Sequence, residues 1–243
     1  MQRLVIKPEQ IQNEQIILQP QQLHYLQGVL RLTQGDNFIA MDGRGKAWIA
    51  KLTNNSATIL ETLAIENREL SVAVTLMVAL PKGNGFDEIV RCCTELGVST
   101  FFPVISDRTL LKPSEKKLAR WQRIATEAVE QSERLFVPTI LPPTPFSLSL
   151  NRYQEQKCKK YICVARGNSP HLLTCLQKLP EVPQDSEQFN IIVATGCEGG
   201  WTPEEIEKAS LAGFQGVSLG KRVLRAITAP MMVMSLIGGV FEE

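Results

Sequence analysis

Strand-like and helix-like patterns alternate from Val72 to the end of the chain, and this alternation limits the possible folds more than any other feature of the sequence. Apolar or β-branched runs predict buried strands at 72–80, 101–105, 159–165, 190–196 and 216–220. Residues 86–97 carry an apolar helical stripe that is expected to end at Gly97. The stripe consists of Phe86, Ile89, Val90, Cys93 and Leu96. Because strands that alternate with helices form parallel sheets covered on both faces, this region is predicted to be an α/β domain.

The other segments of this region are predicted from the same patterns. Residues 114–135 form a long amphipathic helix, whose inward positions are Leu118, Trp121, Ala125, Ala128, Ser132 and Leu135. Residues 141–153 and 180–188 are predicted to be loops. The last helix, at 227–241, is apolar nearly all round, which is more than a solvent-facing terminal helix can carry. We therefore expect a second copy of the chain to cover it.

The chain has a different pattern before residue 70. Residues 36–63 alternate as β-hairpins, with turns at Asp42–Gly43 and Asn54–Asn55. A short helix is predicted at 19–35, because leucines recur three or four residues apart until Gly35 closes it. These signals predict a small β-rich domain at 1–70, followed by the α/β domain at 71–243.

Composition excludes few functions. The net charge of +1 neither favours nor opposes a polyanionic partner, although Lys221, Arg222 and Arg225 cluster without an acid. Six cysteines without paired CxxC spacing and only two histidines argue against a zinc site. Unpaired thiols suit the reducing cytoplasm, and no run approaches the length of a membrane span. We expect a cytoplasmic protein with no bound metal and no membrane partner.

Two glycine-rich loops are the strongest candidates for a binding site. The first, in "IIVATGCEGGWTPEEIE" at 191–207, follows a strand and leads into a helix capped by Thr202 and Glu205. The second, "SLGKRVLRAITAP" at 218–230, follows the last strand. Such loops at one edge of a parallel sheet can hold a flat polar ligand, or can simply make tight turns. Neither has the spacing of a dinucleotide fingerprint or a P-loop.

The segment "GCEGGWTPEEIEKASLAGFQGVSLGKRVLRAITA", at 196–229, resembles the signature of the small-subunit ribosomal RNA uridine-N3 methyltransferases, a family of the SPOUT superfamily. Three further blocks resemble that family in order and spacing, at 24–36, 80–98 and 120–138. The resemblance implies a PUA-like β-barrel that binds RNA, then a SPOUT α/β domain with a C-terminal trefoil knot. It also implies a homodimer that uses S-adenosylmethionine to methylate uracil N3 of one uridine in 16S ribosomal RNA of the small ribosomal subunit.

The resemblance also assigns candidate residues. Those for binding S-adenosylmethionine are Thr195, Gly196, Glu198, Gly199, Gly200, Ser218, Leu219, Gly220, Val223 and Leu224. Arg225 is the catalytic candidate, because its permanent charge can favour a uracil that has lost its N3 proton or can bind phosphate. The plain alternative for Arg225 is a surface ion pair. The candidate RNA contacts are His24 and Arg31, expected on one helix face, with Lys82, Arg134, Lys221 and Arg222.

Two other interpretations stay open. The family's glutamate in the last run is Ile227 here, which favours an RNA-binding or ribosome-assembly protein that kept the fold and lost activity. A third possibility is an α/β enzyme that binds another nucleotide in the glycine loops. Saturable binding of S-adenosylmethionine would exclude the third interpretation, and turnover on ribosomal subunits would exclude the second.

Overall fold

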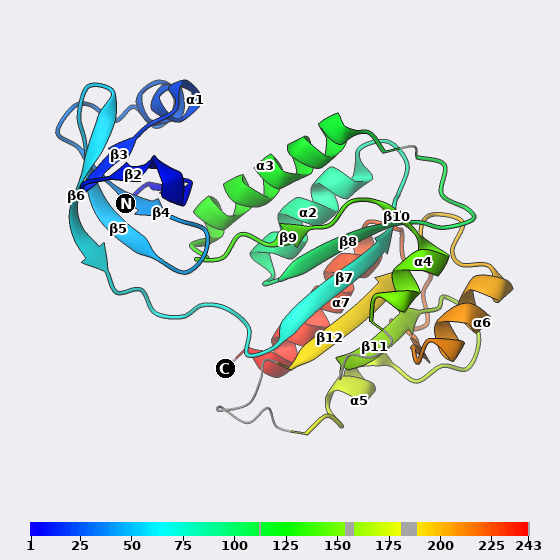
Figure 1. Cartoon of the computed structure of the whole chain (residues 1–243). Coiled ribbons are helices and arrows are strands. Elements are labelled where there is room, and N and C mark those ends of the chain that lie inside the picture. The colour runs from blue at the N-terminus through cyan, green and yellow to red at the C-terminus, as the bar shows by residue number, and fades with distance from the viewer. Residues whose placement is uncertain (112, 154–157, 181–188, 243) are drawn as a thin grey trace. The chain divides into compact units, whose positions relative to one another are not determined.

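The structure is a computed structural model that describes residues 1–111, 113–153, 158–180 and 189–242. It contains two compact units, which Figure 1 shows in the colours of the chain. The first comprises residues 1–69 together with 126–137, and the second comprises residues 70–125 and 138–243. The short segment 126–137 returns to the first unit, whereas the sequence patterns predicted two continuous domains.

The first unit is built on a six-stranded sheet in the order β1-β4-β5-β6-β3-β2. Its elements are β1 (Arg3–Val5), η1 (Pro8–Gln10), β2 (Ile11–Gln12), β3 (Gln15–Ile17), α1 (Pro20–His24), η2 (Tyr25–Val29), β4 (Asn37–Met41), β5 (Ala47–Leu52) and β6 (Ser56–Leu63). The pairs are antiparallel except for β1 with β4. The described ladders do not join β1 to β2, so the sheet forms a half-barrel.

Both predicted hairpin turns of this unit are confirmed. Between β4 and β5, the carboxylate of Asp42 accepts hydrogen bonds from the backbone N–H groups of Arg44 and Lys46, at 2.8 and 3.0 Å. Between β5 and β6, the N–H of Thr53 donates to the carbonyl of Ser56 at 2.9 Å. Short-range bonds of this kind explain why the turns could be predicted from neighbouring residues alone.

The predicted helix at 19–35 is shorter than expected. It runs through α1 and continues as the wider turns of η2 to Val29. Arg31 then has a φ of 57°, in the left-handed region, so the helix has ended before Gly35 is reached. His24 and Arg31 therefore do not lie two turns apart on one helix face, and that prediction is wrong. Both side chains are exposed.

The segment 126–137 covers one face of the first unit's sheet. It begins in the second half of α3 (Glu115–Ser132), and the chain leaves the helix at Glu133, which has a φ of 63°. Val129 and Leu135 pack with Ile39 and Met41 of β4. The carboxylate of Glu130 accepts from the backbone N–H of Val5 at 2.7 Å. Of the predicted inward positions, Trp121, Ala125, Ala128 and Leu135 are buried, whereas Leu118 and Ser132 are half-buried.

The second unit has a sheet in which every pair is parallel, in the order β10-β8-β7-β12-β11-β13, with β9 beside β8. The strands are β7 (Ala73–Ala79), β8 (Thr100–Ile105), β9 (Thr139–Ile140), β10 (Thr144–Pro145), β11 (Cys158–Cys163), β12 (Asn190–Thr195) and β13 (Gln215–Val217). All five predicted strands are present. The prediction of a parallel α/β domain is confirmed.

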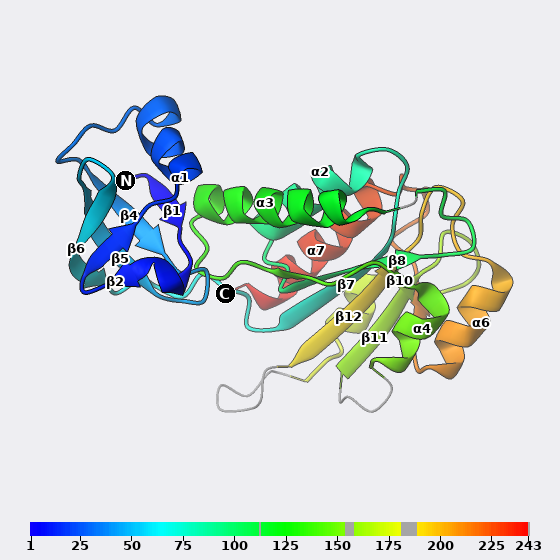
Figure 2. The ribbon, with the colours of Figure 1, turned by 45° about the horizontal axis from the view of Figure 1, so that its top comes forward.

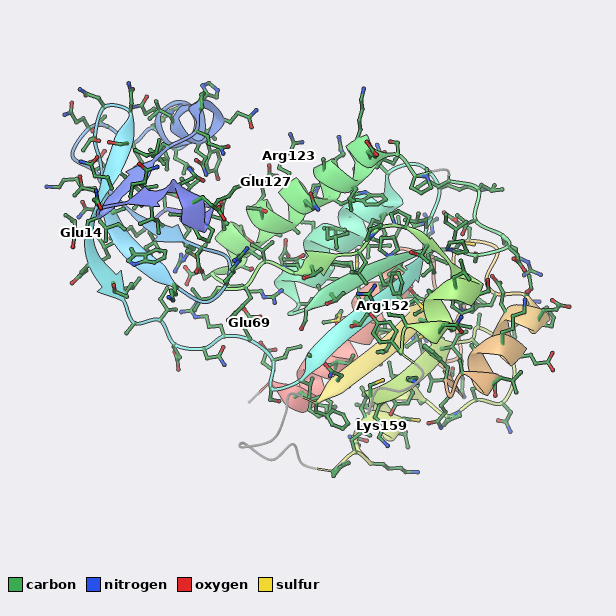
Figure 3. The ribbon with its side chains drawn as sticks, viewed as in Figure 1. Glu14, Glu69, Arg123, Glu127, Arg152 and Lys159 are labelled. Carbon is green, nitrogen blue, oxygen red and sulfur yellow. The ribbon has the colours of Figure 1, made fainter. Side chains whose placement is uncertain are left out.

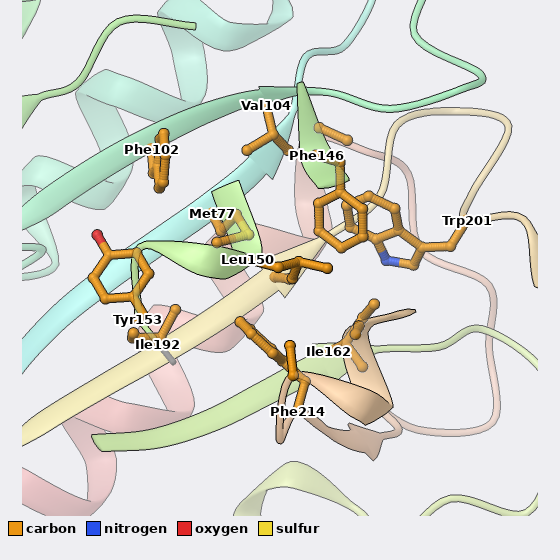
Figure 4. Close-up of a cluster of buried hydrophobic side chains, with 14 of the residues drawn as sticks. Met77, Phe102, Val104, Phe146, Leu150, Tyr153, Ile162, Ile192, Trp201 and Phe214 are labelled. Carbon is orange, nitrogen blue, oxygen red and sulfur yellow. The ribbon is translucent and has the colours of Figure 1, made fainter. Parts of the chain in front are cut away.

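Helices cover both faces of this sheet (Figure 2). One face carries α2 (Gly85–Glu95), α5 (Leu172–Leu176) and α7 (Thr228–Phe241), and α7 contacts the other two helices. The opposite face carries α4 (Phe146–Asn151) and α6 (Pro203–Leu211), which contact each other. Between this second pair and the sheet, the rings of Phe146 and Trp201 stack with centroids 4.4 Å apart (Figure 4). This stacking fixes Trp201 at the start of α6.

Other details of the second unit differ from the prediction. The predicted loop at 141–153 contains β10 and α4, because Phe146 and Leu150 are buried against the sheet. Arg152 lies at the end of that helix, where its guanidinium is 5.9 Å from the ring centre of Phe102 (Figure 3). Leu96 is 37% exposed, since α2 ends just before it. Apart from Pro180, the predicted loop at 180–188 lies outside the described residues. Among the described helices, none has the length and apolar character to span a membrane.

Candidate functional site

A cavity of about 800 Å³ opens at the edge of the second unit's sheet where the parallel strands end. Loops after four strands line it: Arg108 follows β8, 163–166 end β11, 196–201 follow β12, and 219–220 with 222–227 follow β13. A cavity of this size accommodates a cofactor or drug-sized molecule. Ligands of open α/β sheets bind at this edge, so the cavity is the candidate functional site.

The loop after β12 requires glycine at two positions. Gly200 has a φ of 66°, and its N–H donates to the carbonyl of Cys197 at 2.9 Å to close a tight turn. A Cβ added to Gly196 would lie 3.2 Å from the Cα of Gly200. A Cβ added to Gly200 would meet nothing within 4 Å. The turn thus brings two backbones together and leaves open space beside Gly200, which lines the cavity.

Arg108 holds the same loop from β8. Its Nη1 donates to the carbonyl of Gly199 at 2.6 Å and to the carbonyl of Trp201 at 3.3 Å. A Cβ added to Gly199 would lie 3.0 Å from both Cβ and Cδ of Arg108. The arginine stem therefore packs directly on the glycine backbone.

The predicted helix cap after this loop is confirmed and extends further than expected. Thr202 accepts from the N–H of Glu205 at 3.2 Å, and the Glu205 carboxylate accepts from the N–H of Thr202 at 2.8 Å. The other oxygen of Glu205, which is only 4% exposed, accepts from the N–H of Asp107 at 2.9 Å. Glu198 accepts from the N–H of Lys82 at 3.0 Å. These bonds anchor the chain on both sides of residues 199–201 to the sheet edge.

The loop after β13 has a comparable anchor. The hydroxyl of Ser218 accepts from the N–H of Gly220 at 3.1 Å, and Gly220 has a φ of 116°. The N–H of Ser218 donates to the carbonyl of Pro170 at 2.8 Å, which ties the loop to the segment after β11. Arg225 stands just before α7, where its carbonyl accepts from the N–H groups of Thr228 and Ala229.

Most of the predicted cofactor residues come together. Gly196, Glu198, Gly199, Gly200, Leu219, Gly220, Val223 and Leu224 all line the cavity, as do Arg222 and Arg225. Thr195 and Ser218 are adjacent to lining residues. Lys82 and Lys221 are exposed and are not lining residues. Val223 is 70% exposed, which leaves its side chain largely in solvent. The assigned roles stay predictions.

Arg134 does not lie where its predicted role requires. It follows the end of α3, the residue is 4% exposed, and its guanidinium binds the carboxylate of Glu69 through Nε and Nη2. Figure 3 labels Glu69. A buried arginine whose charge is neutralised by a carboxylate cannot also reach an RNA phosphate without breaking that pair. We therefore withdraw Arg134 from the predicted RNA contacts.

The predicted site residues did not include several residues that line the cavity. Among them, Arg108 and Arg166 come from the loops after β8 and β11, Trp201 from the loop after β12, and Ile206 from α6. Only the position of a residue just after a predicted strand could have pointed to Arg108 and Arg166. The order of the strands decides that these two loops adjoin the glycine loops.

Positive charge dominates the lining of the cavity. Arg108, Arg166, Arg222 and Arg225 line it, against a single carboxylate, Glu198. All four arginines are exposed, and within the described part of the chain none of them forms an ion pair. Such an edge attracts an anionic partner.

Two buried polar atoms beside the cavity lack a hydrogen-bond partner among the described residues. They are Oγ1 of Thr195 and Nε1 of Trp201. Thr195 is the last residue of β12, and Trp201 lines the cavity. A buried polar group without a partner costs free energy, so these atoms fit a site that binds a polar ligand. In the described ranges, no three His, Cys, Asp or Glu residues gather as a metal site would require.

Comparisons with known proteins agree with this geometry. The model of the RNA methyltransferase domain family matches residues 68–238, and that of the RNA methyltransferase PUA domain matches residues 18–61. The chain is 48% identical over 244 residues to Ribosomal RNA small subunit methyltransferase E of Synechocystis sp., covering 99% of this chain and 78% of that protein. It is 30% identical over 227 residues to the protein of that name from Bacillus subtilis, covering 89% and 87%.

A solved structure is similar over the same length. The crystal structure of Ribosomal RNA small subunit methyltransferase E from Neisseria gonorrhoeae, bound to S-adenosyl methionine, is 32% identical, with a TM-score of 0.84. The match covers 99% of this chain and 98% of that one. The fold and the matched domains define an RNA methyltransferase with a PUA domain. Within that class, the chain belongs to the family of Ribosomal RNA small subunit methyltransferase E.

Proposed function

We propose that this protein transfers the methyl group of S-adenosylmethionine to N3 of a uridine in 16S ribosomal RNA. The observation that carries the proposal is the cavity between the loop after β12 and the loop after β13. The chain also matches, over nearly its full length, a relative whose structure is bound to S-adenosyl methionine. The open space beside Gly200 and the unpartnered atoms of Thr195 and Trp201 fit a polar, flat cofactor.

In this proposal, the protein holds and orients its two substrates. Backbone groups of the loops after β12 and β13 bind the adenosine portion, while Thr195 and Trp201 gain hydrogen-bond partners. S-adenosylmethionine supplies an electrophilic methyl group when bound. Arg225, exposed at the cavity and without an ion pair among the described residues, places its charge beside a uracil that loses its N3 proton. The plain alternative for Arg225, a surface ion pair, is not supported.

We propose that the first unit binds RNA and the second unit catalyses methyl transfer. The first unit, matched in part by the PUA domain, docks RNA through His24 and Arg31, and the second carries the reaction with Lys82, Lys221 and Arg222 near the RNA. A trefoil knot is supported by the path after β13. That strand lies at the sheet edge beside β11, whereas α7 contacts α2 and β12. The segment between β13 and α7 must therefore cross the cavity, where it passes the loop after β12.

A homodimer is supported by the surface of α7. The helix has no charged residue from Thr228 to Phe241. Met232, Ser235 and Gly239 recur three or four positions apart and are exposed or half-buried. A second copy of the chain would cover this uncharged stripe. Because the substrate is ribosomal RNA, we expect the protein to act in the cytoplasm.

The non-catalytic interpretation is less favoured. A Cβ added to Gly85 would lie 3.1 Å from Cδ1 of Ile227 and 3.1 Å from Cγ of Pro81. Ile227 thus packs against the start of α2 and lines the cavity, where its apolar side chain adds no charge beside the four arginines. The interpretation as an enzyme for another nucleotide is not favoured by the relative bound to S-adenosyl methionine.

Methyl transfer to small ribosomal subunits tests the proposal. Subunits from a strain without this gene are incubated with the protein and S-adenosylmethionine carrying a labelled methyl group. We expect the label in N3-methyluridine of the small-subunit RNA. Because N3 lies on the base-pairing edge, reverse transcription should stop at the modified residue and locate it. Saturable cofactor binding without methyl transfer would favour the non-catalytic alternative, and label in another nucleoside would refute N3 as the acceptor.

A further inference from the structure

The four arginines at the cavity differ in one respect. Arg166, Arg222 and Arg225 have no side-chain hydrogen bond within the described residues, whereas Arg108 binds two carbonyls of the glycine loop. Both bonds come from Nη1, which carries two N–H groups. A guanidinium has five N–H donors, so three remain on Nε and Nη2. Arg108 is exposed and lines the cavity, and these three donors have no partner among the described residues.

The backbone that carries Arg108 is held in place. The N–H of Ser106 donates to Oγ1 of Thr109, and the N–H of Thr109 donates to the carbonyl of Ser106, each at 3.0 Å. The backbone N–H of Asp107, the neighbour of Arg108, donates to the carboxylate of Glu205 in the first turn of α6. A turn fixed at both ends leaves the arginine side chain as the part that can respond to a ligand. Its stem rests on Gly199, so movement of that loop must also move the guanidinium.

We infer that Arg108 is a positioning residue that binds an RNA phosphate with its remaining donors while Nη1 holds the cofactor loop. This inference rests on the proposed function. A bound cofactor that orders residues 199–201 would fix the carbonyls of Gly199 and Trp201. Because both carbonyls bind Nη1 of Arg108, its guanidinium would then be held in one orientation. The planar fork of arginine suits a phosphate only in a fixed orientation. Binding of either ligand would then strengthen binding of the other, because coupling between two sites is reciprocal.

The test is a thermodynamic cycle on the whole protein. The affinity for a fluorescein-labelled oligouridylate is measured with and without saturating S-adenosylhomocysteine, which cannot donate a methyl group. In the native protein, we expect S-adenosylhomocysteine to raise the affinity for oligouridylate about fivefold or more, within the usual range of coupling between sites. Oligouridylate should raise the affinity for S-adenosylhomocysteine by the same factor.

The matched variants are Arg108→Gln and Arg166→Gln, because each removes one exposed cation from the cavity and only Arg108 binds the loop. Arg108→Gln should lose the coupling and lower the salt dependence of RNA binding by about 0.7 in the logarithmic slope, the value for one phosphate contact on a single strand. Arg166→Gln should keep the coupling. Arg108→Lys should keep part of the RNA affinity but lose the coupling, because lysine has no fork.

Two results would overturn the inference: no coupling in the native protein, or coupling of native size in Arg108→Gln. Circular dichroism and thermal unfolding establish that each variant is folded. Should Arg108→Gln fail to fold, native coupling in Arg108→Lys would overturn the inference equally. Failure of methyl transfer to ribosomal subunits would instead refute the proposed function, because this cycle includes no reaction.

Discussion

Replacing Gly200 by alanine tests whether the loop after β12 holds the cofactor. Gly200 has a φ of 66°, and its added Cβ would meet no atom within 4 Å, so the substitution changes backbone strain without a clash. Gly199 would be a poorer test, because its added Cβ would collide with Arg108. Gly213 provides a matched control. It has a φ of 85°, its added Cβ would meet only Nζ of Lys160 at 4.0 Å, and it is not a lining residue of the cavity.

The expected magnitudes follow from the backbone. A residue other than glycine in the left-handed region costs roughly 1–2 kcal/mol. In Gly213→Ala the strain stays in the folded protein, so at about 2–4 °C per kcal/mol for a chain of this size its melting temperature should fall by several degrees. In Gly200→Ala the free loop can relax and must regain the left-handed turn to bind cofactor, so the same energy appears in cofactor binding rather than in unfolding. That corresponds to roughly a 5- to 30-fold weaker affinity for S-adenosylmethionine.

Titration calorimetry with S-adenosylmethionine and thermal unfolding without it separate the two effects. We expect Gly200→Ala to lose affinity with a smaller loss of stability, and Gly213→Ala to lose stability alone. Native affinity in Gly200→Ala, accompanied by the same loss of stability as in Gly213→Ala, would show that the turn at Gly200 has no part in binding the cofactor.

Three further predictions concern the reaction, pH and assembly. Arg225→Ala should slow single-turnover methylation at saturating RNA about a hundredfold or more, with cofactor affinity unchanged and partial recovery in Arg225→Lys; a native rate would remove Arg225 from the reaction. Burial raises the pKa of Glu130 from 4.5 to about 7. The protonated Glu130 carboxyl therefore contributes fully to the free energy of unfolding below pH 4.5, and this contribution is lost as the pH rises through 7. Glu130→Gln should accordingly raise the melting temperature above pH 7 and change it less in acid, and an equal change at both pH values would contradict this. Light scattering should show a dimer that Ser235→Arg, on the uncharged stripe of α7, converts to monomer; a native monomer at micromolar concentration would refute the dimer.

Local sequence patterns predicted most of the fold. The β-branched and apolar runs predicted the five strands, and the cap at Thr202 and Glu205 was readable because its partners lie three positions apart. The hairpin at Asp42 could be predicted for the same reason, because its hydrogen-bond partners are two and four positions away. Local patterns were weakest where packing decides the structure, as in α4, whose helix depends on burying Phe146 and Leu150 against the sheet.

The glycine loops could also be found from the sequence, because each follows a strand and contains residues that a tight turn requires. Their common cavity could not be derived from spacing, since it depends on β13 pairing with β11, and β11 with β12. The family resemblance supplied the link between them. It could not supply Arg108, whose contact with the carbonyl of Gly199 joins residues 91 positions apart.

By itself, the sequence determined the elements, their order and the residues able to make a binding loop, because these depend on neighbours along the chain. Only the tertiary structure decided which charges meet. Arg134 carries the same charge as Arg225, yet it is buried against Glu69, 65 positions away, whereas Arg225 is exposed at the cavity. The same long-range packing assigned residues 126–137 to the first unit. Whether an arginine is neutralised by a carboxylate or available to a ligand is a property of the folded chain, since its partners come from distant segments.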